Sequence, residues 1–167
     1  MPRSSTVCAC LIATASIAAC GCTDSTRRSD AAYAAAFEVV LEAVLPGQQQ
    51  DLYCLGRGRS FSVGHPRAKV FDPPPSLIQE LTRRGYLVRP ISTCKLPTGF
   101  SPGRVKELST GKNAMTISFG DPISAPADSI DISVDYFCGG LCGGLGFVRM
   151  SRKSGNWRGR LESIAVS

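Results

Sequence analysis

Residues 129–167 read SIDISVDYFCGGLCGGLGFVRMSRKSGNWRGRLESIAVS, and this stretch decides the fold class. Its first eight residues alternate polar and apolar side chains, which is typical of a strand with one buried face. Residues 147–152 and 157–166 predict two more strands that pair across a turn at 153–156. The apolar alternation changes phase between Trp157 and Ile164, so we expect a β-bulge at Gly159.

The chain before this stretch also contains predicted strands. Residues 104–109 and 114–119 flank a turn at 110–113 and predict a hairpin, followed by a proline-containing loop at 121–128. Two further strands are expected at 51–57 and 86–93, and Pro90 would place the second at a sheet edge or a bulge. Between them, the prolines and glycines of residues 56–75 predict an irregular segment.

Two helices are predicted. The first spans 31–45, because its apolar residues fall on one stripe with a period of 3.6: Tyr33, Phe37, Val40, Leu41 and Val44. In the second, Ser76 and Gln79 form a capping-box pair, and Gly85 ends the helix. We therefore predict an α+β fold in which two helices pack on an antiparallel sheet of five to seven strands.

The N-terminal segment MPRSSTVCACLIATASIAACGC predicts export. One cation, Arg3, precedes an apolar run that is too short to cross about 30 Å of hydrocarbon, as in a secretory signal peptide. Residues 17–20, Ile-Ala-Ala-Cys, resemble a bacterial lipoprotein signal. That resemblance implies a signal peptide at 1–19 and a lipid on Cys20. The short polar stretch that follows predicts a tether at 20–29, ahead of one α+β domain at 30–167. The alternative is ordinary cleavage after Ala18 or Ala19, which leaves Cys20 as a thiol.

Four cysteines lie in the body of the chain: Cys54, Cys94, Cys138 and Cys142. In an oxidising compartment they predict two disulfides, with three possible connectivities. Cys138 and Cys142 lie in a glycine-rich segment, 138–146, which we interpret as a turn held by a structural disulfide. A redox pair is the first alternative, but three residues separate these cysteines and no helix follows to lower a thiol pKa. A metal site with Cys54, Cys94 or His65 is the second.

The charge pattern favours some partners and argues against others. The formal charge is +6, and loss of Arg3 with the signal peptide makes it +5, which suits an anionic lipid or polysaccharide surface. Five cations and Trp157 lie on the predicted C-terminal hairpin, where we expect an ordinary charged face or contact with lipid head groups rather than nucleic acid: Arg149, Arg152, Lys153, Arg158 and Arg160. Asp131 and Asp135 are expected to be solvated.

No catalytic residue, cofactor or metal is predicted. His65 lies in a predicted loop, and the glycine-containing segments do not match nucleotide-binding motifs, since Arg149 stands where the third Rossmann glycine would fall.

The segment from Tyr136 to the C-terminus resembles the end of small uncharacterised bacterial envelope proteins, which read Tyr-x-Cys-Gly-x-Leu-Cys-Gly, a strand, Lys-x-Gly-x-Trp and a final strand. One helix followed by curved strands ending in Gly-x-Trp also resembles the cystatin-like fold. The first of these resemblances brings no assigned activity with it. From the lipoprotein-like signal and the lack of a catalytic motif, we expect a membrane-anchored cell-envelope protein, facing the periplasm or the exterior, that is a non-enzymatic binding or structural module. Its expected partners are the membrane, through the lipid, and an anionic envelope surface or an envelope protein. The alternative is a pocket enzyme or a small-ligand carrier.

Overall fold

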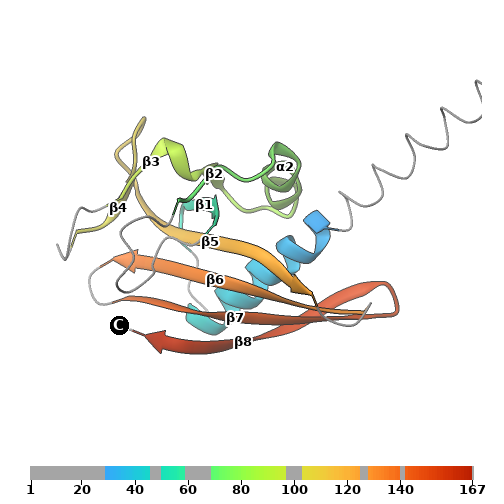
Figure 1. Cartoon of the computed structure of the whole chain (residues 1–167). Helices are drawn as coiled ribbons and strands as arrows, with labels where there is room; N and C mark the ends of the chain where they lie inside the picture. Colours follow the sequence, from blue (N-terminus) through green and yellow to red (C-terminus); the bar gives the residue numbers. More distant parts are fainter. Residues whose placement is uncertain are drawn as a thin grey trace, which may run out of the picture.

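The computed structural model describes residues 29–45, 50–58, 69–96, 103–124, 128–139 and 142–166 (Figure 1). A long helix at residues 29–44 comes first and is followed by a short helix, a 3-10 turn and eight strands. These elements are β1 (Tyr53–Arg57), α2 (Pro75–Arg83), β2 (Val88–Pro90), η1 (Ile91–Thr93), β3 (Cys94–Lys95), β4 (Val105–Glu107), β5 (Asn113–Ser124), β6 (Ser129–Gly139), β7 (Cys142–Lys153) and β8 (Asn156–Val166). The signal peptide, Cys20, the tether to residue 28 and His65 lie outside the described residues.

The strands form one mixed sheet with the order β2-β1-β5-β6-β7-β8, and β4 pairs with both β3 and β5. The α+β class is therefore confirmed, but the prediction of a wholly antiparallel sheet of five to seven strands is wrong. β1 runs parallel to both β2 and β5, whereas the neighbouring strands from β5 to β8 are antiparallel. For β1 and β2 the reason is the connection through α2, because a helix between two paired strands carries the chain back to the same end of the sheet.

The helix at residues 29–44 covers one face of the sheet, which we call the core face (Figure 1). Its predicted stripe is confirmed, since Tyr33, Phe37 and Val40 are buried in the main hydrophobic cluster. Alternate residues of the strands complete that cluster: Tyr53, Leu55, Met115, Ile117, Phe119, Ile132, Val134, Tyr136, Val148 and Met150. The other side chains of these strands point to the opposite face, which we call the outer face.

The second helix begins differently from the prediction. It spans Pro75–Arg83 with Pro74 at its N-cap and makes no side-chain capping bond, so the predicted capping box of Ser76 and Gln79 is wrong. Pro75 suits the first helical position because the first turn of a helix leaves its N–H groups without intrahelical acceptors. The predicted end is confirmed: Gly85 follows the helix with a φ of +94°, a conformation that glycine adopts at little cost.

Three strand boundaries also differ. β5 runs through Pro122 to Ser124, so the predicted loop at 121–128 is shorter; a register shift between Phe119 and Pro122 accommodates the proline. Pro90 ends β2 and a 3-10 turn follows it, in place of one strand over 86–93. The bulge in β8 is not at Gly159, which pairs with Met150, because the register instead shifts where Leu145 pairs with Ala165 and Gly146 with Ser163.

Candidate functional site

The four body cysteines form two disulfides, Cys54–Cys94 and Cys138–Cys142, with Cα atoms 6.3 and 5.2 Å apart. This pairing is one of the three that the sequence allowed. Cys54–Cys94 joins β1 to β3 across 40 residues, whereas Cys138–Cys142 joins the end of β6 to the start of β7. Among the described residues, no three side chains of the metal-binding types histidine, cysteine, aspartate and glutamate come together.

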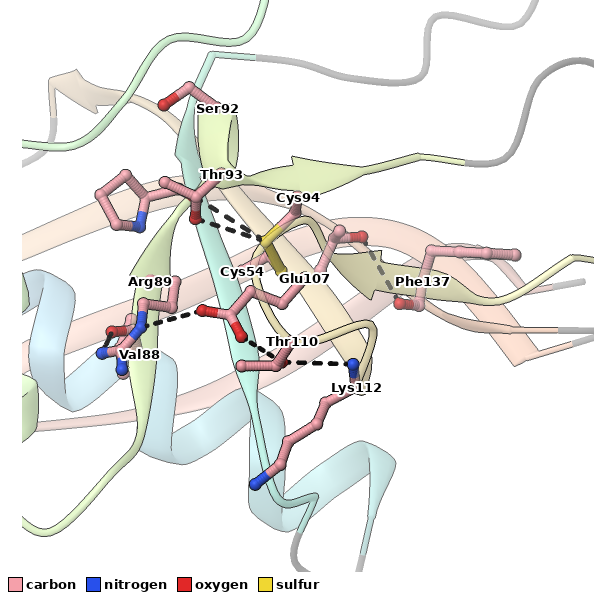
Figure 2. Close-up of a disulfide and its surroundings, with 12 residues drawn as sticks. Cys54, Val88, Arg89, Ser92, Thr93, Cys94, Glu107, Thr110, Lys112 and Phe137 are labelled. Carbon is pink, nitrogen blue, oxygen red and sulfur yellow. Dashed lines mark hydrogen bonds and ion pairs between the residues drawn. A yellow bond between two sulfur atoms is a disulfide. The ribbon is translucent and has the colours of Figure 1, made fainter.

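Cys54–Cys94 belongs to a second, smaller apolar cluster on the outer face of the sheet (Figure 2). Beside it, Glu107 accepts a hydrogen bond from Thr110 and pairs with Arg89 at 3.2 Å. The carboxylate of Glu107 is therefore held between a hydroxyl and a guanidinium. These bonds lower the pKa of Glu107, with the Thr110 hydroxyl as the largest cause. These contacts hold the β4–β5 turn against β2, which is a structural role.

The segment predicted as a glycine-rich turn over 138–146 is mostly strand. β6 continues to Gly139, which pairs with Cys142 at the start of β7. Gly139 has a φ of +102° and an added Cβ would lie 3.0 Å from Arg104 Cγ, so the segment uses glycine both for its conformation and for close packing. The disulfide therefore links the two strands at the turn end of the β6–β7 hairpin, which supports the structural interpretation of Cys138 and Cys142.

The outer face of β6, β7 and β8 carries a row of ion pairs. Asp131 accepts two hydrogen bonds from Arg149, each at 3.0 Å, and Arg149 also reaches Glu162 at 3.5 Å, which pairs with Arg160 at 2.9 Å. Arg149 lowers the pKa of Asp131. Two of the five cations of the predicted basic hairpin are thus neutralised by acidic neighbours on the same face.

Asp135 lies on the same face of β6 as Asp131, as expected, but it is not solvated. Its exposed fraction is 6%, and it sits directly across from Ser118 of β5, which is also buried. Thr116 and Ser133 extend this buried polar row. Sequence reasoning missed the row because it depends on how β5 and β6 align, and no pattern within either strand contains that alignment.

The cations that remain lie at the tip of the β7–β8 hairpin. Lys153 and Arg158 are exposed, Arg152 is half-buried, and Ser151 pairs with Arg158 while Arg152 pairs with Trp157. Within the described residues, none of these three cations forms an ion pair. We call Arg152, Lys153 and Arg158 the basic tip.

A hollow of about 490 Å³ lies between the two helices. It is lined by Asp30, Ala31, Ser76, Gln79, Glu80 and Arg83. Glu80 pairs with Arg83 and Arg84 at 2.9 and 2.8 Å, so its carboxylate is already engaged at the edge of the hollow. The hydrogen bond from Arg84 is the largest cause of a lowered pKa at Glu80.

Among the described residues, aromatic side chains fill space between the long helix and the core face of the sheet. Phe37 meets Tyr53 edge-on at 5.2 Å, Tyr33 packs on Phe119 at 5.8 Å, and the guanidinium of Arg57 lies 4.4 Å from the Tyr33 ring centroid. Burial raises the pKa of Tyr33 and Tyr53. These phenols are therefore neutral packing groups.

Neither described helix is both long and apolar enough to cross a bilayer. Comparison of the chain with protein-family models, with curated proteins and with solved structures finds no match.

Proposed function

We propose that this protein is a lipid-anchored cell-envelope protein whose domain is a non-enzymatic binding or structural module. The anchor rests on the signal sequence and on Cys20. Disulfides form and persist in oxidising compartments, so the Cys54–Cys94 and Cys138–Cys142 bonds agree with a position outside the cytoplasm. In this proposal the domain faces the periplasm or the exterior.

The observation that carries the non-enzymatic part is the filled core face. Enzymes and carriers usually bind small molecules in a concave apolar pocket with a few polar groups. In this chain Tyr33, Phe37 and Tyr53 occupy the space between the long helix and the sheet, and all three are buried. The hollow between the helices is instead lined mainly by polar and charged residues. Binding of a protein or an envelope surface through the outside of the domain is therefore favoured over binding of a small molecule in a pocket.

A cystatin-like arrangement is part of the same proposal. The long helix packed on the antiparallel strands β5 to β8 supports it, whereas the parallel pairs of β1 with β2 and β5 depart from a simple version of that fold. The partner in this proposal is an anionic envelope surface or an envelope protein, in keeping with the cationic chain.

Replacement of the proposed lipid acceptor tests the anchor. The full chain and the Cys20→Ser variant are expressed in a bacterial host, membranes are separated, and the purified proteins are weighed. We expect the wild type to be found in the membrane fraction, to lack residues 1–19 and to carry acyl mass. The Cys20→Ser variant should carry no acyl mass.

Cys22→Ser is the matched control, because it removes the neighbouring thiol and should leave both the mass gain and the membrane fraction unchanged. A wild-type chain without acyl mass, or a Cys20→Ser chain that keeps it, would overturn the proposal.

A further inference from the structure

We infer that the basic tip of the β7–β8 hairpin docks on anionic phospholipid head groups of the bilayer that holds the Cys20 lipid. The inference rests on the proposed anchor and adds an orientation of the domain and a lipid partner to it. Four observations carry it: the local charge, the shape of the hairpin, its place relative to the tether and the length of that tether.

The charges near the turn of the hairpin have one sign. Residues 149–160 contain five cations and no acid. Asp131 and Glu162 balance Arg149 and Arg160, which leaves the three cations of the basic tip beside one acid, the exposed Asp128, and thus a positive excess. Anionic lipids attract cationic side chains held close to their head groups, and each such Lys or Arg strengthens binding about fivefold.

The hairpin is ordered up to its tip. Ser154 and Gly155 have φ angles of 51° and 84°, so both central residues of the turn are in the left-handed region, which matches the twist of two tightly joined strands. The backbone N–H of Arg152 donates to the carbonyl of Asp128 at 2.7 Å, which fastens the hairpin to the start of β6. The cations are thus carried on a hairpin whose turn has a defined conformation and which is bonded to the start of β6.

The hairpin tip and the start of the long helix lie at the same end of the sheet (Figure 1). Phe37 contacts Tyr53, which pairs with Met115, whereas Tyr33 contacts Phe119 further along β5. The helix therefore starts near the end of β5, where β7 ends and β8 begins. Any tether that precedes residue 29 leaves the domain from this end.

The tether is long enough for the tip to reach the membrane. From the level of Phe119 and Gly146, β7 continues eight residues to Ser154, about 26 Å at 3.3 Å per residue. From Tyr33 the helix runs back four residues to Ser29, about 6 Å. The turn thus projects roughly 20 Å beyond the helix start. Nine residues link Cys20 to Ser29 and span at most about 30 Å, so the lipid and the tip can meet one bilayer together.

Energy transfer from Trp157, the single tryptophan of the chain, tests the docking. The native full-length product is purified from membranes and reconstituted in vesicles that contain a head-group-labelled dansyl lipid as acceptor. One set of vesicles is phosphatidylcholine, and the other is phosphatidylcholine mixed with phosphatidylglycerol. We expect greater transfer in the anionic vesicles, and high salt should return it to the level in phosphatidylcholine because screening weakens the attraction.

The variant K153Q/R158Q removes two exposed cations from the tip. We expect its docking to be about 25-fold weaker and its excess transfer in anionic vesicles to fall by at least half. The matched control is K95Q/K106Q, which removes the same charge from exposed positions on β3 and β4 at the opposite end of the sheet (Figure 1). This control should keep the wild-type excess, and the thermal unfolding of both variants should match that of the wild type.

The outcomes separate the docking from the anchor. A chain that incorporates into both kinds of vesicle and gives equal transfer in them overturns the docking alone. Equal losses in K153Q/R158Q and K95Q/K106Q also overturn it, because they would show a response to net charge instead of to the tip. A chain that carries no acyl mass and incorporates into neither vesicle overturns the proposed anchor and, with it, the inference.

Discussion

At the scale of single residues, the contacts of the Glu107 carboxylate make the stability of the fold depend on pH. The hydroxyl of Thr110 and the guanidinium of Arg89 both bond its carboxylate and lower its pKa. A carboxyl group whose pKa is lower in the folded than in the unfolded chain stabilises the fold above its unfolded pKa. That contribution is lost as the pH falls through the folded pKa.

We therefore predict that Glu107→Gln lowers the melting temperature at pH 7 and that the difference from wild type shrinks below about pH 4.3, where an unfolded glutamate protonates. Thermal melts between pH 7 and pH 3 measure this. Glu42→Gln is the control, because Glu42 is exposed on the long helix and should follow the wild-type curve at every pH. A constant difference for Glu107→Gln down to pH 3 would contradict the prediction.

At the scale of secondary-structure elements, the two disulfides differ in the length of chain that they close. Cys54–Cys94 spans 40 residues and Cys138–Cys142 spans four. If loop entropy dominates, the longer loop contributes about 4 kcal/mol to the free energy of unfolding and the shorter one about 2 kcal/mol.

We expect the double variant Cys54→Ala/Cys94→Ala to lose about 4 kcal/mol of unfolding free energy and Cys138→Ala/Cys142→Ala about 2 kcal/mol. Denaturant titrations of both variants beside the wild type give these values. The two variants are controls for each other, since each removes one disulfide and replaces two cysteines with alanine. A larger loss for the 138–142 variant would mean that local geometry at the glycine-rich hairpin outweighs loop entropy.

The elements that the sequence predicted correctly are those whose signal is local. The stripe of Tyr33, Phe37 and Val40 is confirmed, and so is the strand predicted from the alternation of β6. The expected burial of only one face of β6 is wrong, because residues 132–136 are all buried. The direction of β1 could not be predicted in this way, because it depends on strands that are distant in sequence. β1 pairs with β5 about sixty residues later, and nothing in its own residues distinguishes a parallel from an antiparallel partner.

At the scale of the whole molecule, the candidate surfaces depend on register and on the path of the chain. The ion pairs of Arg149 require Asp131 and Glu162 on neighbouring strands, and burial of Asp135 requires Ser118 opposite it. The sequence identified the cations of the hairpin but could not separate the neutralised pair, Arg149 and Arg160, from the basic tip. That separation needs the alignment of β6, β7 and β8.

The length of the tether gives a further prediction at this scale. The tether and the basic tip lie at the same end of the domain, so the lipid anchor keeps the tip close to the bilayer. This raises the effective concentration of anionic lipid around the tip. A flexible glycine-serine insert after residue 24 that makes the tether about four times longer should lower this concentration by at most about twofold, because the longer chain exceeds the roughly 20 Å that the tether has to span. We expect the excess Trp157 transfer in anionic vesicles to fall in the wild-type background, whereas K153Q/R158Q should respond much less. An insert that leaves the wild-type excess unchanged would show that the tip binds lipid without help from the anchor.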